Sequence, residues 1–454
     1  MVIDSLLVAN RGEIARRVMR TARRLGMRTV AVYSEADAGA LHVQEADTAV
    51  LLGPAPPAQS YLDVDAVLRA ARSCDAQGVH PGYGFLSESA AFARAVRAAG
   101  LVWVGPDPES IEQMGDKVSA RNLMAAAGVP VAAGSALALT DVQAALADAA
   151  RIGYPVMVKA SGGGGGIGMS VARDEAGLRT AFETARSRAE RFFGNPELLL
   201  ERYLPHARHV EVQVLGLADG RVVTLGERDC SVQRRHQKLA EETPSPGVDG
   251  PLRERMLAAA VLAGEAVGYR GAGTVECLLD PVAGDFVFLE MNTRLQVEHP
   301  VTEMVTGLDL VEQQLLVACG EPPTFDTSRA TGGVPATGHA LQMRVCAEDP
   351  VRFLPGPGTI TGWEEPSGPG IRVDSGYRAG DTVSAHYDPL MAKLVVHGQD
   401  RDQTLERART AVAAFRVTGP RCNLPFFAEL LDDQRFRSGQ YDTGLVGLMR
   451  ATPE

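Results

Sequence analysis

The sequence has few cysteines and no long apolar run, and each shortage excludes a class of protein. Its six cysteines form no CxxC pair, so neither a disulfide framework nor a zinc site is predicted. No apolar run approaches the roughly 20 residues that span a bilayer. The amino terminus lacks the basic and long apolar regions of a signal peptide, because VIDSLLVAN leads directly into the charged stretch RGEIARR. We therefore expect a reduced, cytoplasmic protein with no membrane partner.

Positive charge is also scarce, since 45 Lys and Arg residues stand against 56 Asp and Glu residues and the net charge is −11. This balance argues against nonspecific binding to nucleic acid or to an anionic membrane. A length of 454 residues and a hydrophobic content of 45% are sufficient for two or three domains with full cores.

Two common nucleotide-binding fingerprints are missing as well. Strands at residues 5–9 and 29–33 flank a helical pattern at 13–25, and this alternation predicts a parallel sheet. The first turn, ANRGEI, is not GxGxxG, so a nicotinamide cofactor is weakly supported. The glycine run at 162–166 is not followed by GK[ST], and this excludes a Walker A loop.

That glycine run lies between two predicted strands, residues 154–160 and a strand that begins at Ser170. Its N–H groups can approach a polyphosphate closely, with Lys159 as the counter-charge. The alternative is a flexible linker. The tight bracketing by two apolar strands favours a mobile flap over phosphate.

A predicted hairpin at 274–291 carries more acidic side chains than a buried hairpin normally does. If its turn at 281–284 closes symmetrically, Glu276 lies opposite Glu290 and Leu278 lies opposite Phe288. The alternation sends one set of side chains to the core: Val275, Cys277, Leu279, Val287, Leu289 and Met291. Facing carboxylates repel unless a cation lies between them, which favours a divalent ion with Asn292 as a further ligand. The alternative is a solvated hairpin face.

Further polar groups continue or accompany this row. Arg294, Gln296 and Glu298 follow at the same spacing.

The stretch HPGYGFLSE at 80–88 is either a ligand loop or a packed loop. The basic run ERDCSVQRRHQK at 227–238 is a solvated face, a nucleic-acid contact or a site for small oxyanions. Arg344, on an otherwise apolar strand, requires an anionic partner, of which a neighbouring acid is the simplest.

The motifs VANRGEIA, HPGYGFLSE, MGDK, KASGGGGG, ERDCSVQRRHQK and EMNTRLQVEHPVTE occur in this order, and together they resemble biotin carboxylase, the ATP-grasp subunit of acetyl-CoA and other acyl-CoA carboxylases. The resemblance implies a multidomain α/β and α+β fold. A Rossmann-like N-terminal domain is expected at 1–114 and an ATP-grasp domain, with a mobile lid at 132–203, at 115–330. An α+β C-terminal domain is expected at 331–446.

The resemblance also implies roles for individual residues. Contacts to ATP are expected from Lys117, Lys159, Gly162, Gly163, Gly164, Gly165, Gly166, Glu201, Leu204, His209, Gln233, His236 and Leu278. Glu276, Glu290 and Asn292 would hold Mg²⁺ or Mn²⁺. Bicarbonate would contact Lys238, Arg294, Gln296 and the backbone of Val297, while Tyr83 and Arg344 would face biotin. The catalytic set is Glu298, Arg344, Lys238 and Arg294, and Glu211 is expected to line the active centre.

The implied reaction is carboxylation of biotin N1′ through carboxyphosphate, with release of ADP and phosphate. Glu298 would deprotonate bicarbonate and Arg344 would stabilise the ureido enolate. No biotinyl domain is recognised, so biotin is expected on a separate carrier protein, with a carboxyltransferase subunit and a homodimer completing the assembly. The alternatives are a subunit of a pyruvate or other non-CoA carboxylase, another ATP-grasp ligase, and a nucleotide-binding regulatory subunit.

Two stretches of the chain depart from the family pattern. Ile167 stands where an Arg or Lys is expected after the glycines. Gln342 and Met343 stand where a Glu and a small residue usually precede Arg344. The first change removes a cation from the flap, and the second removes a carboxylate beside the biotin-side arginine.

Overall fold

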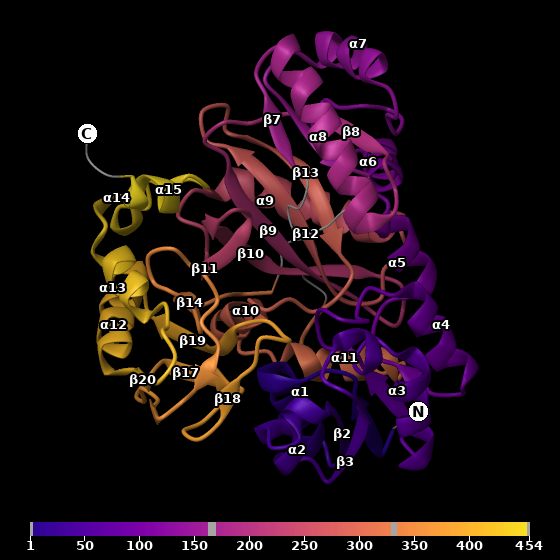
Figure 1. Ribbon diagram of the computed structural model, residues 1–454, viewed down its shortest axis with the longest axis vertical. Helices are drawn as coiled ribbons and strands as arrows, with labels where there is room; N and C mark the ends of the chain where they lie inside the picture. The colour runs from indigo at the N-terminus through magenta and orange to yellow at the C-terminus, as the bar shows by residue number, and fades with distance from the viewer. Residues whose placement is uncertain (1–2, 162–168, 328–333, 452–454) are drawn as a thin grey trace.

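The computed structural model describes residues 3–161, 169–327 and 334–451, which form a three-part body around a central sheet (Figure 1). The glycines Gly162 to Gly166 and Ile167 lie outside the described residues. No helix of the described chain has the length and apolar character needed to cross a membrane.

The N-terminal part is a five-stranded parallel sheet in the order β3-β2-β1-β4-β5, as the alternation predicts. Leu6 and Val8 on β1 pack into one core and Leu7 into another, so helices cover both faces of the sheet. The elements of this part are β1 (Ser5–Val8), α1 (Gly12–Arg24), β2 (Arg28–Ser34), η1 (Glu35–Asp37), α2 (Leu41–Glu45), β3 (Thr48–Gly53), η2 (Pro57–Gln59), α3 (Val64–Ser73), β4 (Gly78–His80), α4 (Ala90–Ala98), β5 (Val102–Trp103) and α5 (Pro108–Gly115).

A small unit projects at the top of Figure 1 and has its own sheet, in the order β7-β6-β8, and its own apolar core. It occupies most of the range expected for the lid. Its elements are α7 (Val142–Ile152), β6 (Val156–Ala160), β7 (Ser170–Ala172), α8 (Glu175–Phe193) and β8 (Leu198–Arg202), and α6 (Lys117–Ala126) leads into it.

The centre of the molecule is an eight-stranded sheet in the order β13-β12-β9-β10-β11-β14-β19-β17. Its strands before residue 330 are β9 (Arg208–Gly216), β10 (Val222–Arg234), β11 (Gln237–Thr243), β12 (Gly271–Asp280) and β13 (Asp285–Asn292), with helices α9 (Gly250–Ala266), α10 (His299–Thr306) and α11 (Leu310–Ala318). The sheet continues without a break from β11 into β14 (His339–Cys346), on the other side of residue 330.

The C-terminal part extends this sheet and covers it with helices. Its remaining strands are β15 (Gly358–Thr359), β16 (Gly362–Glu364), β17 (Ile371–Ser375), β18 (Thr382–Val383), β19 (Leu390–Gly398) and β20 (Arg416–Thr418). Its helices are α12 (Arg401–Ala414), α13 (Leu424–Asp432), α14 (Gln434–Arg437) and α15 (Leu445–Arg450). One apolar core joins these helices to β14 and β19.

The β12–β13 hairpin confirms part of the predicted register and corrects the rest. Glu276 lies opposite Glu290, but Cys277 pairs with Phe288 and Leu278 with Val287, because a β-bulge leaves Leu289 as an extra residue on β13. Phe288 therefore packs into the core, and the prediction that Val287 and Leu289 point there is wrong. A one-residue slip reverses every side chain beyond it.

The basic run at 227–238 is not a solvated face. It forms the end of β10 and the start of β11, and Arg228 and Asp229 within it are buried. Arg235 and His236 make the turn between the strands with positive φ angles of 48° and 67°.

Candidate active site

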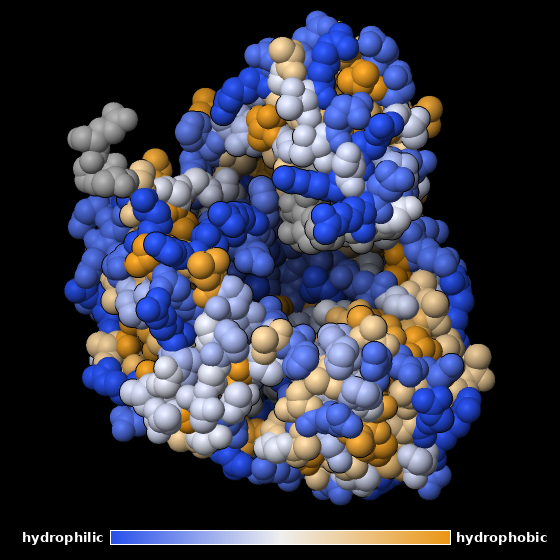
Figure 2. Space-filling model, in the orientation of Figure 1, coloured by the Kyte–Doolittle hydropathy of each residue, from blue (hydrophilic) through white to orange (hydrophobic). Residues whose placement is uncertain are grey.

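The site is built on three adjacent strands, each of which contributes one carboxylate. Glu276 on β12 pairs in register with Glu211 on β9 and with Glu290 on β13. Glu276 and Glu211 are buried, whereas the Glu290 side chain is 37% exposed. Cross-strand neighbours of one charge destabilise a sheet, so this row requires cations. Figure 2 shows that the molecule is hollowed at its centre, below the lid, and that hydrophilic residues gather there.

Lys238 on β11 supplies one of those cations. Its Nζ lies 2.6 Å from Glu211 Oε2, 2.7 Å from Glu276 Oε1 and 2.8 Å from Glu298 Oε1. Burial alone would lower the pKa of Lys238, but the three carboxylates raise it well above its usual value. Lys238 is thus charged. It connects the row of cross-strand carboxylates, Glu211, Glu276 and Glu290 (the acid row), to Glu298, the predicted base.

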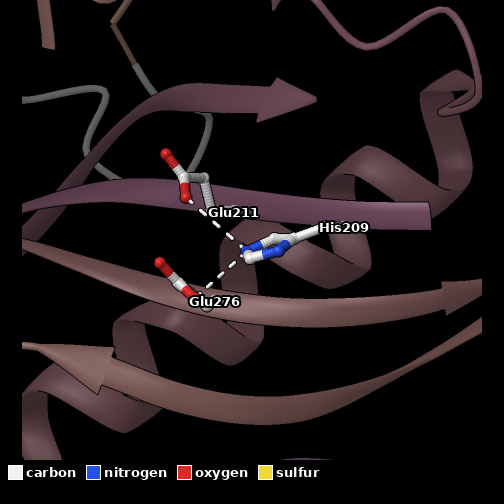
Figure 3. Close-up of side chains that lie close together, drawn as sticks. All are labelled: His209, Glu211 and Glu276. Atoms are coloured by element: carbon white, nitrogen blue, oxygen red, sulfur yellow. Dashed lines mark ion pairs between the residues drawn. The ribbon is translucent and has the colours of Figure 1, made fainter. Parts of the chain in front are cut away.

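His209 supplies a second positive group from β9, two residues from Glu211. Figure 3 shows its ring pointing between the carboxylates of Glu211 and Glu276, with Nε2 at 3.8 Å and 3.1 Å from their Oε2 atoms. Although burial opposes the charged form, Glu276 raises the pKa of His209. In turn Lys238 and His209 together hold the pKa of Glu276 well below its usual range, against the effect of burial.

The predicted metal ligands lie together and have oxygen atoms of the kind that Mg²⁺ prefers. Asn292 Nδ2 donates to Glu276 Oε1 at 2.9 Å, and Lys117 Nζ donates to Glu290 Oε2 at 3.2 Å. His209, Glu211 and Glu276 also bring one ligand atom each within 4.8 Å of one another. The donor set therefore fits a divalent cation, and the alternative of a solvated hairpin face is wrong because Glu276 is only 5% exposed.

Arg228 on β10 binds Glu211 of the acid row, and the sequence analysis did not identify Arg228 as a site residue. Its side chain is fully buried, donates from Nε to Glu211 Oε1 at 2.6 Å and from Nη1 to Gln213 Oε1 at 2.6 Å, and reaches Thr302 and Thr274. Because a fully buried charge is costly without partners, the Arg228 guanidinium holds the side chains of Glu211 and Gln213 in place. Alternation along the strand at 222–234 did not identify Arg228 as inward-facing, because an irregularity between Thr224 and Glu227 shifts the register before it.

The row after β13 forms the predicted anion-binding side. Gln296 Nε2 donates to Glu276 Oε1 at 2.9 Å, and Arg294 Nη2 donates to Asn292 Oδ1 at 2.9 Å. Glu88, at the end of the stretch at 80–88, accepts from Arg294 Nε at 2.8 Å and from the backbone of Thr293 at 3.2 Å. The loop HPGYGFLSE therefore contributes to the site through Glu88, which the sequence reasoning did not name.

Glu298 connects the acid row to Arg344 on β14. Arg344 Nη2 donates to Glu298 Oε2 at 3.0 Å, and its Nε donates to Glu241 Oε1 at 2.6 Å. Burial opposes ionisation of Glu298, but Lys238, Arg344 and Arg228 lower its pKa far below the usual value. The expected neighbouring acid of Arg344 is thus present twice, as Glu298 and as Glu241.

Tyr83 reaches the same end of the site from the N-terminal part. Its hydroxyl donates a short hydrogen bond to Glu13 Oε1, and Lys393 Nζ lies 2.9 Å from Glu13 Oε2. Lys393 on β19 pairs in register with Arg344 on β14 and lies 5.9 Å from the centre of the Tyr83 ring. The two predicted biotin residues therefore share Lys393 as a neighbour.

The predicted ATP residues divide between the lid and the central sheet. Lys159 on β6 and Glu201 on β8 form an ion pair in the lid. Burial lowers the pKa of His236, and the charges of Lys159 and His209 lower it further. Gln233 pairs in register with Lys238, and Leu278 lies on β12 opposite His209. Leu204 follows β8 and is partly buried, and Val297 lies partly buried between Gln296 and Glu298.

Three family profiles match the chain and together extend over most of it. Residues 2–111 match the biotin carboxylase N-terminal domain, residues 116–324 the ATP-binding domain of the carbamoyl-phosphate synthase L chain, and residues 342–447 the biotin carboxylase C-terminal domain. These ranges follow the order of the three expected parts.

Individual relatives agree with the profiles. Biotin carboxylase of Halalkalibacterium halodurans is 48% identical over 98% of this chain and 97% of its own length. Biotin carboxylase of Campylobacter jejuni, solved as a βγ-ATP complex, superposes with a TM-score of 0.95 at 41% identity, over 98% of this chain and 99% of that one.

A second solved structure is the biotin carboxylase domain dimer of 2-oxoglutarate carboxylase from Hydrogenobacter thermophilus, in complex with MgADP, ADP and bicarbonate. It has a TM-score of 0.95 at 40% identity, over 100% of both chains. The expected α/β and α+β fold is confirmed by these neighbours, and the chain belongs to the biotin carboxylase family of ATP-dependent ligases.

Proposed function

We propose that this chain carboxylates biotin at N1′, with ATP and bicarbonate as co-substrates and carboxyphosphate as the intermediate, as part of an acetyl-CoA or other acyl-CoA carboxylase. The observation that carries the proposal is the position of Glu298, which shares Lys238 with the acid row and Arg344 with the biotin side. The buried carboxylate of Glu298 therefore contacts a residue proposed to bind bicarbonate, Lys238, and a residue proposed to bind biotin, Arg344.

Glu276, Glu290 and Asn292 would hold Mg²⁺ or Mn²⁺, because they supply the oxygen ligands of the row. The ion would neutralise charge on the ATP phosphates. Lys117, next to Glu290, and Lys159, in the lid, would add cations from two other directions. Phosphoryl transfer depends on such positioned charges rather than on covalent chemistry from the protein.

The neighbours support the nucleotide assignment, since the Campylobacter jejuni enzyme was solved as a βγ-ATP complex and the Hydrogenobacter thermophilus domain with MgADP. We assign ATP contacts to Lys117, Lys159, Gly162 to Gly166, Glu201, Leu204, His209, Gln233, His236 and Leu278 on the family motif.

Bicarbonate would bind to Lys238, Arg294, Gln296 and the backbone N–H of Val297. In the ligand-free arrangement, Lys238 keeps Glu298 ionised and suppresses its basicity. An anion that draws Lys238 toward itself would raise the pKa of Glu298 and so make it a better base at the moment when bicarbonate is bound. Attack of the deprotonated bicarbonate on the γ-phosphate then forms carboxyphosphate and releases ADP.

Carboxyphosphate would break down to CO₂ and phosphate, and the phosphate would take the N1′ proton of biotin. Arg344 would stabilise the enolate oxygen of the ureido group, with Tyr83 beside it. Biotin would arrive on a carrier domain, and a carboxyltransferase would pass the carboxyl group to the final acceptor. The similarity to a 2-oxoglutarate carboxylase domain makes a non-CoA acceptor the second candidate.

Bicarbonate-dependent ATP hydrolysis that free biotin stimulates is the direct test. The purified chain should show it in the presence of Mg²⁺, and Glu298→Gln should abolish it while ATP binding remains. A rate of ATP hydrolysis that does not depend on bicarbonate or biotin would contradict the proposal and favour another ATP-grasp ligase. Copurification of a carboxyltransferase, followed by assays with acetyl-CoA, propionyl-CoA, pyruvate and 2-oxoglutarate, identifies the acceptor.

A further inference from the structure

Arg344 is held between two carboxylates that approach different nitrogen atoms of its guanidinium. Glu298 Oε2 accepts from Nη2 at 3.0 Å, and Glu241 Oε1 accepts from Nε at 2.6 Å. Glu298 also accepts from Lys238, so it has a second cation. Among the hydrogen bonds of the described residues, Arg344 is the one cationic donor to Glu241, and the amide of Gln342 is the other donor.

Glu241 is itself fixed by the residue that departs from the family pattern. Gln342 pairs with Glu241 in register across β11 and β14, and its Nε2 donates to Glu241 Oε2 at 3.0 Å. Both side chains are almost completely buried. Gln342 and Arg344 are two residues apart on β14 and project from the same face, so both oxygens of Glu241 are bound by donors from one strand.

We propose that Glu241 is a positioning residue that sets the orientation of the Arg344 guanidinium toward biotin, and that Gln342 keeps Glu241 in its ionised, accepting form. The inference rests on the proposed role of Arg344 and deepens it. A guanidinium that must meet a developing oxyanion gains from a fixed direction, because preorganised donors need no rearrangement during the reaction.

Charged groups around Glu241 act in opposite directions on its ionisation, so the side chain at position 342 can shift the balance. Arg344 on β14 and Lys238 on its own strand favour the charged form, whereas Glu298 and burial oppose it, and the thiol of Cys230 on β10 lies within reach of its charge. Burial, the largest effect, together with Glu298 raises the pKa of Glu241 to about 7. A donor such as the Gln342 amide stabilises the carboxylate, while a second carboxylic acid at position 342 would share a proton with it.

Three variants of the full chain test the inference with free biotin as the probe. In Glu241→Gln, kcat/KM for biotin should fall by about 10-fold to 100-fold, the value of a hydrogen bond to a charged group. ATP hydrolysis without biotin should change far less, because Lys238 still holds Glu298. In Gln342→Glu, the acid limb of the pH profile for biotin-dependent turnover should move upward by about one pH unit.

The double variant Glu241→Gln/Gln342→Glu separates positioning from packing. It keeps a buried amide–carboxylate pair across the two strands but removes the carboxylate from Arg344 Nε, so it should fold normally and remain impaired toward biotin. Glu242→Gln is the matched control, because Glu242 is an equally buried neighbour whose partners are His339 and Arg401. It should lose stability without a change in KM for biotin.

Normal biotin kinetics in Glu241→Gln, or full recovery in the double variant, would overturn the inference, as would an unshifted pH profile in Gln342→Glu. These results leave the proposed function intact. Absence of bicarbonate-dependent, biotin-stimulated ATP hydrolysis in the unmodified chain would instead refute the proposed function, and this inference with it.

Discussion

Replacement of Lys238 by methionine should destabilise the protein severely and in a pH-dependent way. The Lys238 side chain is 12% exposed, and its partners Glu211, Glu276 and Glu298 are 0%, 6% and 2% exposed. Removal of one member of a buried ion pair costs about 3–5 kcal/mol, because it leaves an uncompensated charge. Three carboxylates would lose their shared partner at once, so we expect the upper end of that range or beyond.

The pH dependence follows from the sign of the pKa shifts. The folded-state pKa of Glu276 is lowered, and that of Glu298 is lowered too, so their contribution is present above the unfolded pKa of roughly 4.5 and is lost as pH falls. Without Lys238 these pKa values rise, and some carboxylates bind protons near neutrality. The stability lost in Lys238→Met should therefore be larger at about pH 8 than at about pH 6.

Chemical denaturation of both proteins at the two pH values measures the effect, and Lys117→Met is the matched control. The Lys117 side chain is 23% exposed and contacts Glu290, which is 37% exposed, so its loss should cost no more than about 1 kcal/mol. The reasoning is refuted if Lys238→Met and Lys117→Met lose equal stability, or if the loss in Lys238→Met is the same at both pH values.

Three other predictions use the same site. Arg228→Met should cost about 3–5 kcal/mol, because it leaves the fully buried Glu211 charge without its guanidinium, and thermal denaturation should show it even without substrates. Glu276→Gln should weaken Mn²⁺ binding, measured by electron paramagnetic resonance with ATP present, while Glu265→Gln, at an exposed position of helix α9, should not; equal binding by both variants would contradict the metal assignment. Glu298→Gln should lower bicarbonate-dependent ATP hydrolysis by at least about 100-fold, the usual effect of losing a general base, and an active variant would show that another group deprotonates bicarbonate.

The sequence predicted the parts of the site that depend on local periodicity. Alternation and turn position placed Glu276 opposite Glu290, and the structure agrees. The same reasoning failed at Phe288, because a β-bulge inserts one residue without any Gly or Pro to mark it. Local patterns also did not reveal Arg228 or Glu241, whose importance comes from partners far along the chain.

Long-range pairing accounts for most of what the sequence could not predict. Arg344 and Glu241 are separated by 103 positions, and Arg294 and Glu88 by 206. The basic run at 227–238 was open to three interpretations, since its alternation is hidden by charges that turn out to face buried acids. The roles of Lys238 and Glu298 therefore rested on the family resemblance, and the structure adds that each is the other's counter-ion before any ligand binds.

The unbroken hydrogen bonding from β11 to β14 limits which distances can change during turnover. Glu241 and Lys238 lie on one of these strands and Arg344 on the next, so the proposed bicarbonate residues and the proposed biotin residue are held by one sheet. The unit proposed as the lid has a separate sheet and a separate core, so a hinge motion of this unit would leave the pairing of β11 with β14 unchanged. If this unit opens to release ADP, as the proposed function requires, the arrangement of Lys238, Glu241 and Arg344 can persist from one turnover to the next.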